Sequence, residues 1–319
     1  MTNALPVLLD VDTGGDDALA LLLAMASPAL DVRGITCVAG NCALPQVVSN
    51  TLALLDAISA PSIPVAPGMD RPILETGLPA PPLHGSDGMG DLGLAAPRHS
   101  QAGVHAVEFL QRTLADSAEP MTLICLAPLT NIAMLLRLYP RIEDKIERLY
   151  VMGGTFAAPG NTTPAAEFNV RYDPEAAAIV LHSGLPVTLY PLDPFVQVRF
   201  TVEEARKLSQ AKGAGARIAG GIALHYCRFF KMDFSLIGDA GTVATVIDPA
   251  GATSERRPVH VELSGGTTRG ATVFDRRILT DGYAREGKWT DVDVVSKVDA
   301  NRYRKLMAAA LGAEEALDD

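Results

Sequence analysis

The sequence predicts an α/β fold: an open, mostly parallel sheet with helices on both faces, in a single domain. Apolar runs of strand length alternate with longer helical patterns along most of the chain, which is the βαβα rhythm of a parallel sheet. At 319 residues the chain can bury a substantial core, and no repeat, low-complexity block or linker divides it. We therefore expect residues 1–319 to form one domain.

The first strand and helix hold a cluster of acidic side chains. An apolar run over 5–11 predicts a buried strand, Thr13-Gly14-Gly15 a tight turn, and the following Ala- and Leu-rich segment a helix that begins near Asp16. Asp16 or Asp17 alone could simply cap this helix. Asp10 and Asp12, two apart on the strand, point to the same side. Because four neighbouring carboxylates repel one another, we expect protonation or a bound hard cation, Ca²⁺ or Mg²⁺.

Further elements follow in the same alternation. The predicted strands after the first cover residues 32–38, 121–126, 149–152, 187–189, 259–263, 271–274 and 291–295. The predicted helices cover residues 45–58, 104–115, 174–182, 201–232 with a weak joint at 213–215, 243–247 and 300–311, and another begins near Thr130. Open α/β sheets bind ligands at the carboxyl ends of their strands.

Polar residues follow several of these strands. Asn41 lies at one strand end, and a loop after another carries Asn161, Glu167 and Asn169, whose side chains can hydrogen-bond sugar hydroxyls or simply shape turns. His84 lies in an HGSDG motif within a long Pro- and Gly-rich loop, where it is either an ordinary surface histidine or a substrate contact. Segments 68–99 and 213–238 are candidate active-site lids.

The composition of the chain limits the kinds of molecule that it is expected to bind. The formal net charge is −10, from 27 Lys and Arg against 37 Asp and Glu, without a basic block, which argues against nucleic acid and anionic membranes. Asp10 comes too early for a signal peptide, and no apolar run approaches membrane-spanning length. We therefore expect a cytoplasmic protein. The scattered cysteines predict reduced thiols: Cys37, Cys42, Cys125 and Cys227.

Several motifs in the same order resemble the nucleoside hydrolases, calcium-dependent ribonucleoside N-glycosidases. The opening motif DVDTGGDDALAL at 10–21 is the most specific of them. It is supported by AGN at 39–41, HGSDG at 84–88, PLTNIA at 128–133, MGG at 152–154, the GN-to-EFN segment at 160–169 and TVFD at 272–275. The resemblance covers nearly the whole chain and implies the fold of that family.

The resemblance also implies roles for individual residues. Calcium would bind the side chains of Asp12, Asp17 and Asp239 and the backbone carbonyl of Leu126, and Asp12 would also be the general base. The implied substrate-binding residues are Asp16, Asn41, His84, Asn161, Glu167, Phe168 and Asn169. Asp10 matches a supporting carboxylate. A homodimer or homotetramer is implied, with a ribonucleoside or another N-riboside as the small-molecule substrate.

The implied chemistry is hydrolysis of the N-glycosidic bond by a calcium-bound water that Asp12 activates. Such cleavage passes through an oxocarbenium-like ribosyl cation, so it requires a positioned water, negative groups around the sugar and help for the departing base. General-base help is typically worth ~10² to 10⁴ in rate. The remainder must come from positioning and electrostatics.

Two positions depart from the family pattern. Thr13-Gly14 replaces the usual proline of the first motif, and Gly238 stands where the family often has a histidine that protonates the leaving base. Help for the leaving group is then expected from a water or from one of His84, His225, Tyr226 and Arg228. Trp289, the only tryptophan, could serve by stacking but has no predicted place at the site.

Two other functions are compatible with parts of the sequence. Asp10-Val11-Asp12-Thr13 also fits the DxDxT motif of haloacid-dehalogenase-like phosphatases, with Asp10 as nucleophile and Mg²⁺ as cofactor. That reading leaves Asp16, Asp17 and the EFN motif unexplained. The second alternative is a calcium-dependent protein that binds ribosyl ligands without turnover, because Gly238 has replaced the acid.

Overall fold

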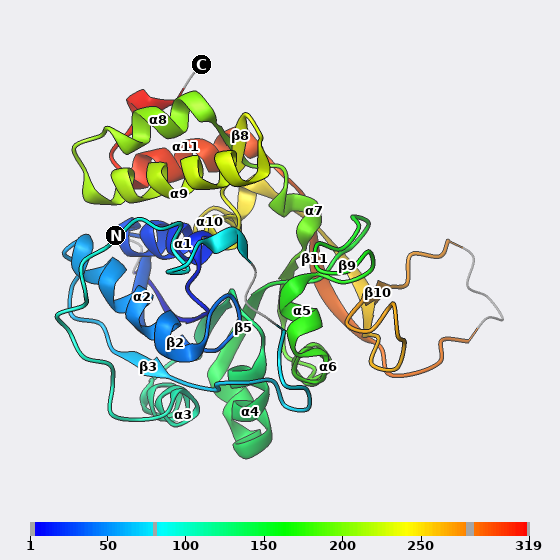
Figure 1. The fold of residues 1–319 in the computed structure, drawn as a ribbon. Helices are drawn as coiled ribbons and strands as arrows, with labels where there is room; N and C mark the ends of the chain where they lie inside the picture. Colours follow the sequence, from blue (N-terminus) through cyan, green and yellow to red (C-terminus); the bar gives the residue numbers. More distant parts are fainter. Residues whose placement is uncertain (1–3, 79–81, 279–283, 318–319) are drawn as a thin grey trace.

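The fold is a nine-stranded sheet between layers of helices, as predicted (Figure 1). The computed structural model describes residues 4–78, 82–278 and 284–317. The strand order is β10-β9-β11-β6-β5-β4-β1-β2-β3. The strands are β1 Leu5–Val11, β2 Leu30–Cys37, β3 Val65–Pro67, β4 Met121–Cys125, β5 Ile146–Met152, β6 Val187–Tyr190, β9 Ala252–Val261, β10 Thr272–Phe274 and β11 Thr290–Val298.

Strand β1 lies inside the parallel part of the sheet. It pairs in parallel with β2 and β4, so that Asp10 lies opposite Thr36 on one side and Cys125 on the other. The parallel pairing continues through β5 and β6 to β11, whereas β9 and β10 are antiparallel. Alternate residues of β1 enter two different cores, because Val7 and Leu9 face one layer and Leu8 faces the other.

Helices cover both faces. The α-helices are α1 Gly15–Ala26, α2 Leu44–Ala57, α3 Ala106–Asp116, α4 Thr130–Leu138, α5 Phe168–Tyr172, α6 Pro174–Leu181, α7 Leu192–Phe195, α8 Val202–Ser209, α9 Ala214–Phe230, α10 Ala240–Ile247 and α11 Ala300–Ala310. Helices α1, α2, α9, α10 and α11 contribute to one core, and α3, α4 and α6 to the other. Helices α8, α9 and α11 lie together at the top of Figure 1.

The structure adds short elements that hydrophobic patterns did not predict. Strand β3 is only three residues long, as are β7 Arg199–Thr201 and β8 Phe234–Leu236, which pair with each other outside the main sheet. Helices α5 and α7 were also unpredicted, because segments this short carry no helical periodicity. Strand β9 begins at Ala252, well before the predicted start, because its first half is partly exposed and polar. The 3₁₀ helices are Pro82–His84, Pro140–Lys145, Pro249–Gly251 and Glu314–Ala316.

The remaining sequence expectations concern cysteines and membranes. All four cysteines are free thiols, as predicted. Among the residues that the structure describes, no helix has the length and apolar character needed to cross a membrane.

Candidate active site

A large cavity opens at the carboxyl ends of the parallel strands. It has a volume of about 870 Å³, within the range of small-molecule pockets. Its polar lining includes the predicted residues Asp16, Asn41, His84, Leu126 through its backbone, Asn161, Glu167, Asn169 and Asp239, together with the predicted Phe168. Loops after β1, β2, β4 and β5 therefore meet at one place, because parallel strands end at the same edge of the sheet.

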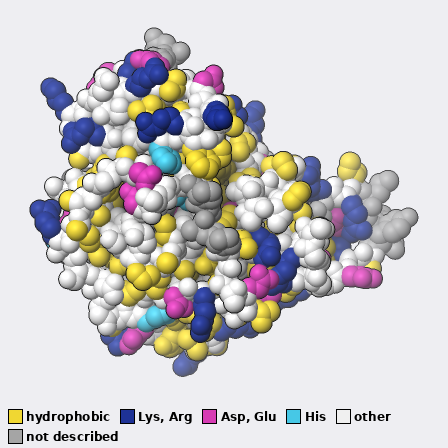
Figure 2. Space-filling model, in the orientation of Figure 1, with side chains coloured by type: hydrophobic (Ala, Val, Ile, Leu, Met, Phe, Trp, Pro, Cys, Tyr) yellow, Lys and Arg dark blue, Asp and Glu magenta, His cyan; other side chains and the backbone are white. Residues whose placement is uncertain are grey.

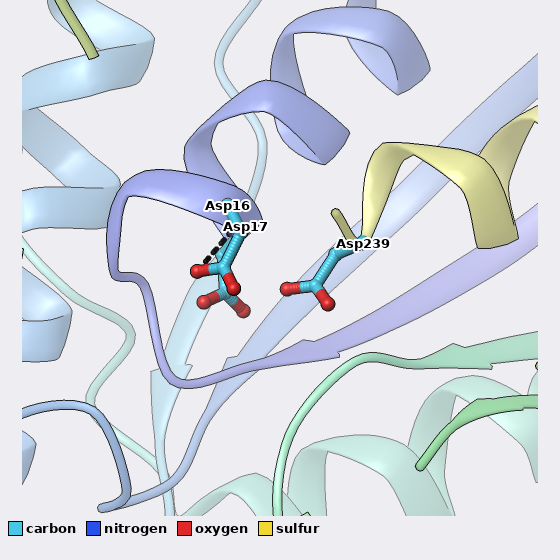
Figure 3. Close-up of side chains that lie close together, drawn as sticks. All are labelled: Asp16, Asp17 and Asp239. Atoms are coloured by element: carbon cyan, nitrogen blue, oxygen red, sulfur yellow. Dashed lines mark hydrogen bonds between the residues drawn. The ribbon is translucent and has the colours of Figure 1, made fainter. Parts of the chain in front are cut away.

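Three carboxylates of this site point toward one another (Figure 3). Asp16 and Asp17 begin α1, and Asp239 precedes α10. One oxygen of each lies within 4.8 Å of the others, a spacing that a single metal ion could bridge. Asp12 is not in this group of three.

Asp12 and Asp17 lie deeper, where backbone groups hold both side chains. Asp17 accepts the backbone N–H of Asp12 at 3.1 Å and that of Gly14 at 3.0 Å, which closes the turn between β1 and α1. Asp12 accepts the backbone N–H of Asn41 at 2.7 Å. Gly40 allows this approach, because a Cβ there would lie 2.0 Å from an oxygen of Asp12. Both carboxylates are fully buried.

Burial and mutual repulsion raise the pKa values of Asp12, Asp17 and Asp239. Desolvation and then the charge of Asp17 raise the pKa of Asp12 well above its usual value. Desolvation and then the charge of Asp16 raise the pKa of Asp17 to about 7. Asp239 has a raised pKa for the same two reasons. Among the described residues that line the cavity, none is Lys or Arg, so the chain supplies no side-chain cation to offset them there.

Asp10 lies behind the site and does not line the cavity. It is 2% exposed, and one of its oxygens accepts hydrogen bonds from Thr36 at 2.6 Å and Asn131 at 2.8 Å. The other oxygen is buried without a partner among the described residues. Desolvation raises the pKa of Asp10 to about 7.

Residues at the start of α5 form another part of the cavity wall. Glu167 caps this helix, accepting the backbone N–H of Asn169 at 2.8 Å and of Gly154, after β5, at 2.9 Å. Desolvation raises the pKa of Glu167 to about 7. The amide of Asn169 donates to the carbonyl oxygen of Leu126 at 2.8 Å. These contacts fix the EFN segment against the ends of β4 and β5.

His84 is a buried site residue rather than an ordinary surface histidine. It is 3% exposed, and burial lowers its pKa. Its Nδ1 accepts the backbone N–H of Gly15 at 3.3 Å and lies 2.9 Å from the hydroxyl of Tyr226. An added Cβ at Gly14 would lie 2.8 Å from His84, and one at Gly15 would lie 2.4 Å from Tyr226. The Gly-Gly turn therefore allows both side chains to approach.

Position 238 has no room for a side chain. Gly238 has a φ of +57°, and an added Cβ would lie 2.8 Å from the Cβ of Asp16 and 3.2 Å from the Phe195 ring. The absence of histidine here is therefore built into the backbone and the neighbouring packing.

Of the other candidates for helping the leaving group, Tyr226 lines the cavity, whereas His225, Arg228 and Trp289 do not. His225 is directed to the carbonyl oxygen of Leu83, at 2.9 Å, and Arg228 is exposed. Neither residue lines the cavity, nor does Trp289, whose ring NH donates to Glu286.

Sequence patterns missed much of the apolar wall. It includes Phe195 from α7, Phe230 from α9 and Phe234 from β8. Helix α7 directly follows β6, so the rule that ligands bind at strand ends could have pointed to Phe195. Both candidate lid segments contribute to the lining. Segment 68–99 contributes Leu78, Leu83 and His84, and segment 213–238 contributes residues between Tyr226 and Gly238. Residues 79–81 of the first segment lie outside the described residues.

The donor set suits a hard cation. Carboxylate oxygens and the carbonyl of Leu126 are the available ligands, and Ca²⁺ and Mg²⁺ prefer oxygen. The hydrogen bond from Asn169 leaves a second lone pair on that carbonyl.

Comparison with known proteins agrees with this geometry. A profile of the inosine-uridine preferring nucleoside hydrolases matches residues 7–305. The pyrimidine-specific ribonucleoside hydrolase RihA of Escherichia coli (strain K12) is 38% identical over 301 residues, covering 93% of this chain and 96% of the relative. RihA of Shigella boydii serotype 4 is 37% identical over the same length.

Solved structures show the same fold. The inosine-guanosine nucleoside hydrolase superposes with a TM-score of 0.89 at 31% identity, covering 97% of this chain and 99% of the other. A purine-preferring ribonucleoside hydrolase from Gardnerella vaginalis gives 0.87 at 28% identity, covering 98% and 100%. Family profile, sequence relatives and fold agree over nearly the full length, and the chain belongs to the inosine-uridine preferring nucleoside hydrolase family.

Proposed function

We propose that the protein hydrolyses the N-glycosidic bond of ribonucleosides or related N-ribosides, releasing ribose and the free base, with Ca²⁺ as cofactor and Asp12 as general base. The observation that carries this proposal is the convergence of Asp16, Asp17 and Asp239 at the floor of a large cavity. The names of the relatives, which are ribonucleoside hydrolases, support the reaction class.

The proposed calcium ligands are Asp12, Asp17, Asp239 and the carbonyl of Leu126. Asp16 offers a further ligand oxygen, because it lies with Asp17 and Asp239 in the group of three. When bound, a calcium ion supplies positive charge and Lewis acidity that lower the pKa of water.

Asp12 would take the proton of the attacking water. The backbone N–H of Asn41 and the turn around Asp17 hold its carboxylate in place, which limits the reorganisation needed during reaction. Negative charge on Asp16 and Glu167 would stabilise the positive charge that develops on the ribosyl ring. Asn41, Asn161 and Asn169 would bind its hydroxyl groups, and Phe168 would pack beside the substrate.

The leaving base would receive a hydrogen bond rather than a proton. Because Nδ1 of His84 accepts the N–H of Gly15, the hydrogen of the neutral ring is placed on Nε2, where it can donate to the base. The hydroxyl of Tyr226 supports this arrangement from the other side of Nδ1. Segments 68–99 and 213–238 would serve as lids by excluding water.

A panel of purine and pyrimidine ribonucleosides, assayed for free ribose with calcium and with a chelator, tests the proposal. We expect release of ribose that the chelator abolishes and calcium restores, and we expect Asp12→Asn to remove nearly all activity. Asp31→Asn, at a partly exposed carboxylate on β2 that pairs with Arg33 away from the cavity, is the matched control. Equal activity in chelator would contradict the calcium assignment. Nucleoside binding without release would favour the alternative of a ribosyl-binding protein.

Subunit number is proposed from the family resemblance alone. A homodimer or homotetramer is expected, and sedimentation of the full chain measures it directly.

A further inference from the structure

An aromatic ring stands beside the position where the family often places an acid. A Cβ at Gly238 would lie within 3.4 Å of two atoms of the Phe195 ring. Phe195 is half-buried and lines the cavity. At this point the wall therefore offers an aromatic ring, and Gly238 offers no proton donor.

The charge of the cavity favours a cation. Asp16, Glu167 and Asp239 line it, whereas none of the described lining residues is Lys or Arg. Asp12 and Asp17 lie just behind, so the carboxylates outnumber the charge of one divalent ion. Aromatic side chains complete the wall, and aromatic rings attract cations. They are Phe168, Phe195, Phe230 and Phe234, of which Phe234 already packs against the guanidinium of Arg199, 4.1 Å from its ring centroid. Figure 2 shows several Lys and Arg side chains gathered over the upper helices instead.

The side chains singled out to help the leaving base are poorly suited to protonate it. The hydroxyl of Tyr226 lines the cavity but is directed to Nδ1 of His84, at 2.9 Å. Gly238 has no side chain, and Nδ1 of His84 accepts an N–H, so its ring is neutral and offers only a hydrogen bond. Both oxygens of Glu167 accept backbone N–H groups. A neutral base needs a proton as it departs, whereas an aglycone with a fixed positive charge becomes neutral by keeping the bonding electron pair.

Building on the proposed hydrolase activity, we propose that the preferred substrates are N-ribosides with a fixed cationic aglycone, such as an N7-alkylated purine or a pyridinium. Phe195 is the specificity-determining residue against which this aglycone packs. The water oxygen forms a bond to C1′ as the C1′–N bond breaks, and the electron pair stays on nitrogen. The water proton passes to Asp12 and then to solvent, so each turnover releases one net proton.

Ribosides with a charged base are intrinsically more reactive, so their rates of hydrolysis alone do not show that the site prefers them. Binding affinity measured without turnover does not depend on this reactivity. Titration calorimetry with the Asp12→Asn variant in calcium would compare 7-methylinosine with inosine. In a buffer acidic enough that 7-methylinosine keeps its N1–H, the two ligands differ in one methyl group and one charge. We expect 7-methylinosine to bind about tenfold more tightly, and Phe195→Leu to remove most of this ratio. Phe195→Tyr, which keeps the ring, should preserve it. Phe109→Leu, at a half-buried phenylalanine packed on Gly34, is the matched control and should also preserve it.

The outcomes distinguish this inference from the proposed function. Equal or tighter binding of inosine, or an unchanged ratio in Phe195→Leu, would overturn the cation preference. If Phe195→Leu did not fold, two measurements would still test the cation preference. They are the affinity for 7-methylinosine relative to inosine in Asp12→Asn, and the kcat/KM for 7-methylinosine relative to inosine in the wild type. Hydrolysis of inosine without a preference for 7-methylinosine would overturn the inference and leave the hydrolase assignment intact. Failure to hydrolyse any riboside would overturn both.

Discussion

Asn41 contacts both oxygens of Asp12: its backbone N–H donates to Oδ2 at 2.7 Å and its side-chain amide to Oδ1 at 3.3 Å. The same amide also donates to Asp17 at 3.1 Å. One residue at the end of β2 therefore links the proposed base to a proposed calcium ligand on the adjacent β1–α1 turn.

Asn41→Ala should lower kcat/KM by about tenfold to a hundredfold, because a hydrogen bond to a charged group is worth about 1.5–3 kcal/mol. The amide lowers the pKa of Asp17, so its loss should move the acidic limb of the pH–rate profile upward. Asn50→Ala is the control, since this buried amide donates to the carbonyls of Thr13 and Asp87 and not to a carboxylate. An unmoved acidic limb in Asn41→Ala would contradict this role.

Asp10→Asn should retain activity within a few-fold of the wild type. The hydrogen bonds from Thr36 and Asn131 go to one oxygen, which an asparagine keeps, while the other oxygen has no partner to lose among the described residues. Steady-state kinetics with the best nucleoside of the panel would measure this. If Asp10 were the nucleophile of a phosphatase, the same substitution would abolish turnover, and phosphate release from a phosphomonoester would accompany wild-type activity.

The metal-free protein should lose stability as pH rises from about 4 to beyond about 7. Burial raises the folded-state pKa values of Asp10 and Asp17 to about 7, from the ordinary value of 3.8 for an aspartate. Between these pH values the folded state binds more protons than the unfolded state, so the free energy of unfolding falls with pH. Calorimetric melting from pH 4 to 8 in chelator would follow this decline.

Calcium should reverse much of that decline, because it stabilises the ionised carboxylates and binds only the folded site. The same melting series in excess calcium is expected to give a higher Tm, with the largest gain near and above pH 7. A Tm in calcium that matches the chelator series at every pH would argue against a metal at these residues.

Gly238→Ala should destabilise the fold through both backbone strain and contact. A left-handed φ costs a non-glycine residue roughly 1–2 kcal/mol, and the added Cβ would also meet Asp16 at 2.8 Å. Denaturant unfolding should therefore show a larger loss than for Gly93→Ala, where φ is +64° but nothing lies within 4 Å. Gly103→Ala has neither feature and should change stability by less than about 0.5 kcal/mol.

A comparison of kcat/KM separates the site effect from the stability effect. Gly238→Ala should lower kcat/KM because it displaces Asp16 or Phe195. Gly312→Ala, where φ is +60° and nothing lies within 4 Å, is outside both lid segments and should leave kcat/KM unchanged. Equal loss of activity in the two variants would mean that contact at position 238 is unimportant.

The sequence by itself determined the core of the sheet and the place of the acidic turn. The strand over 5–11, the Gly-Gly turn and the helix behind it are local features, read from a continuous apolar run and its termination. Asn41 and Glu167 were singled out because they follow strands whose ends meet at one edge of a parallel sheet, whereas Leu126 came from the family resemblance. Their detailed roles came from resemblance and remain predictions.

Only the tertiary structure decided which side chains that are distant in sequence come into contact. His84 and Tyr226 are 142 positions apart, and their contact depends on how a loop and α9 fold over the first turn. The structure also places Asp16, rather than Asp12, with Asp17 and Asp239. Phe195 and Gly238 meet because α7 and the segment before α10 converge on the cavity, a non-local packing that no hydrophobic period encodes.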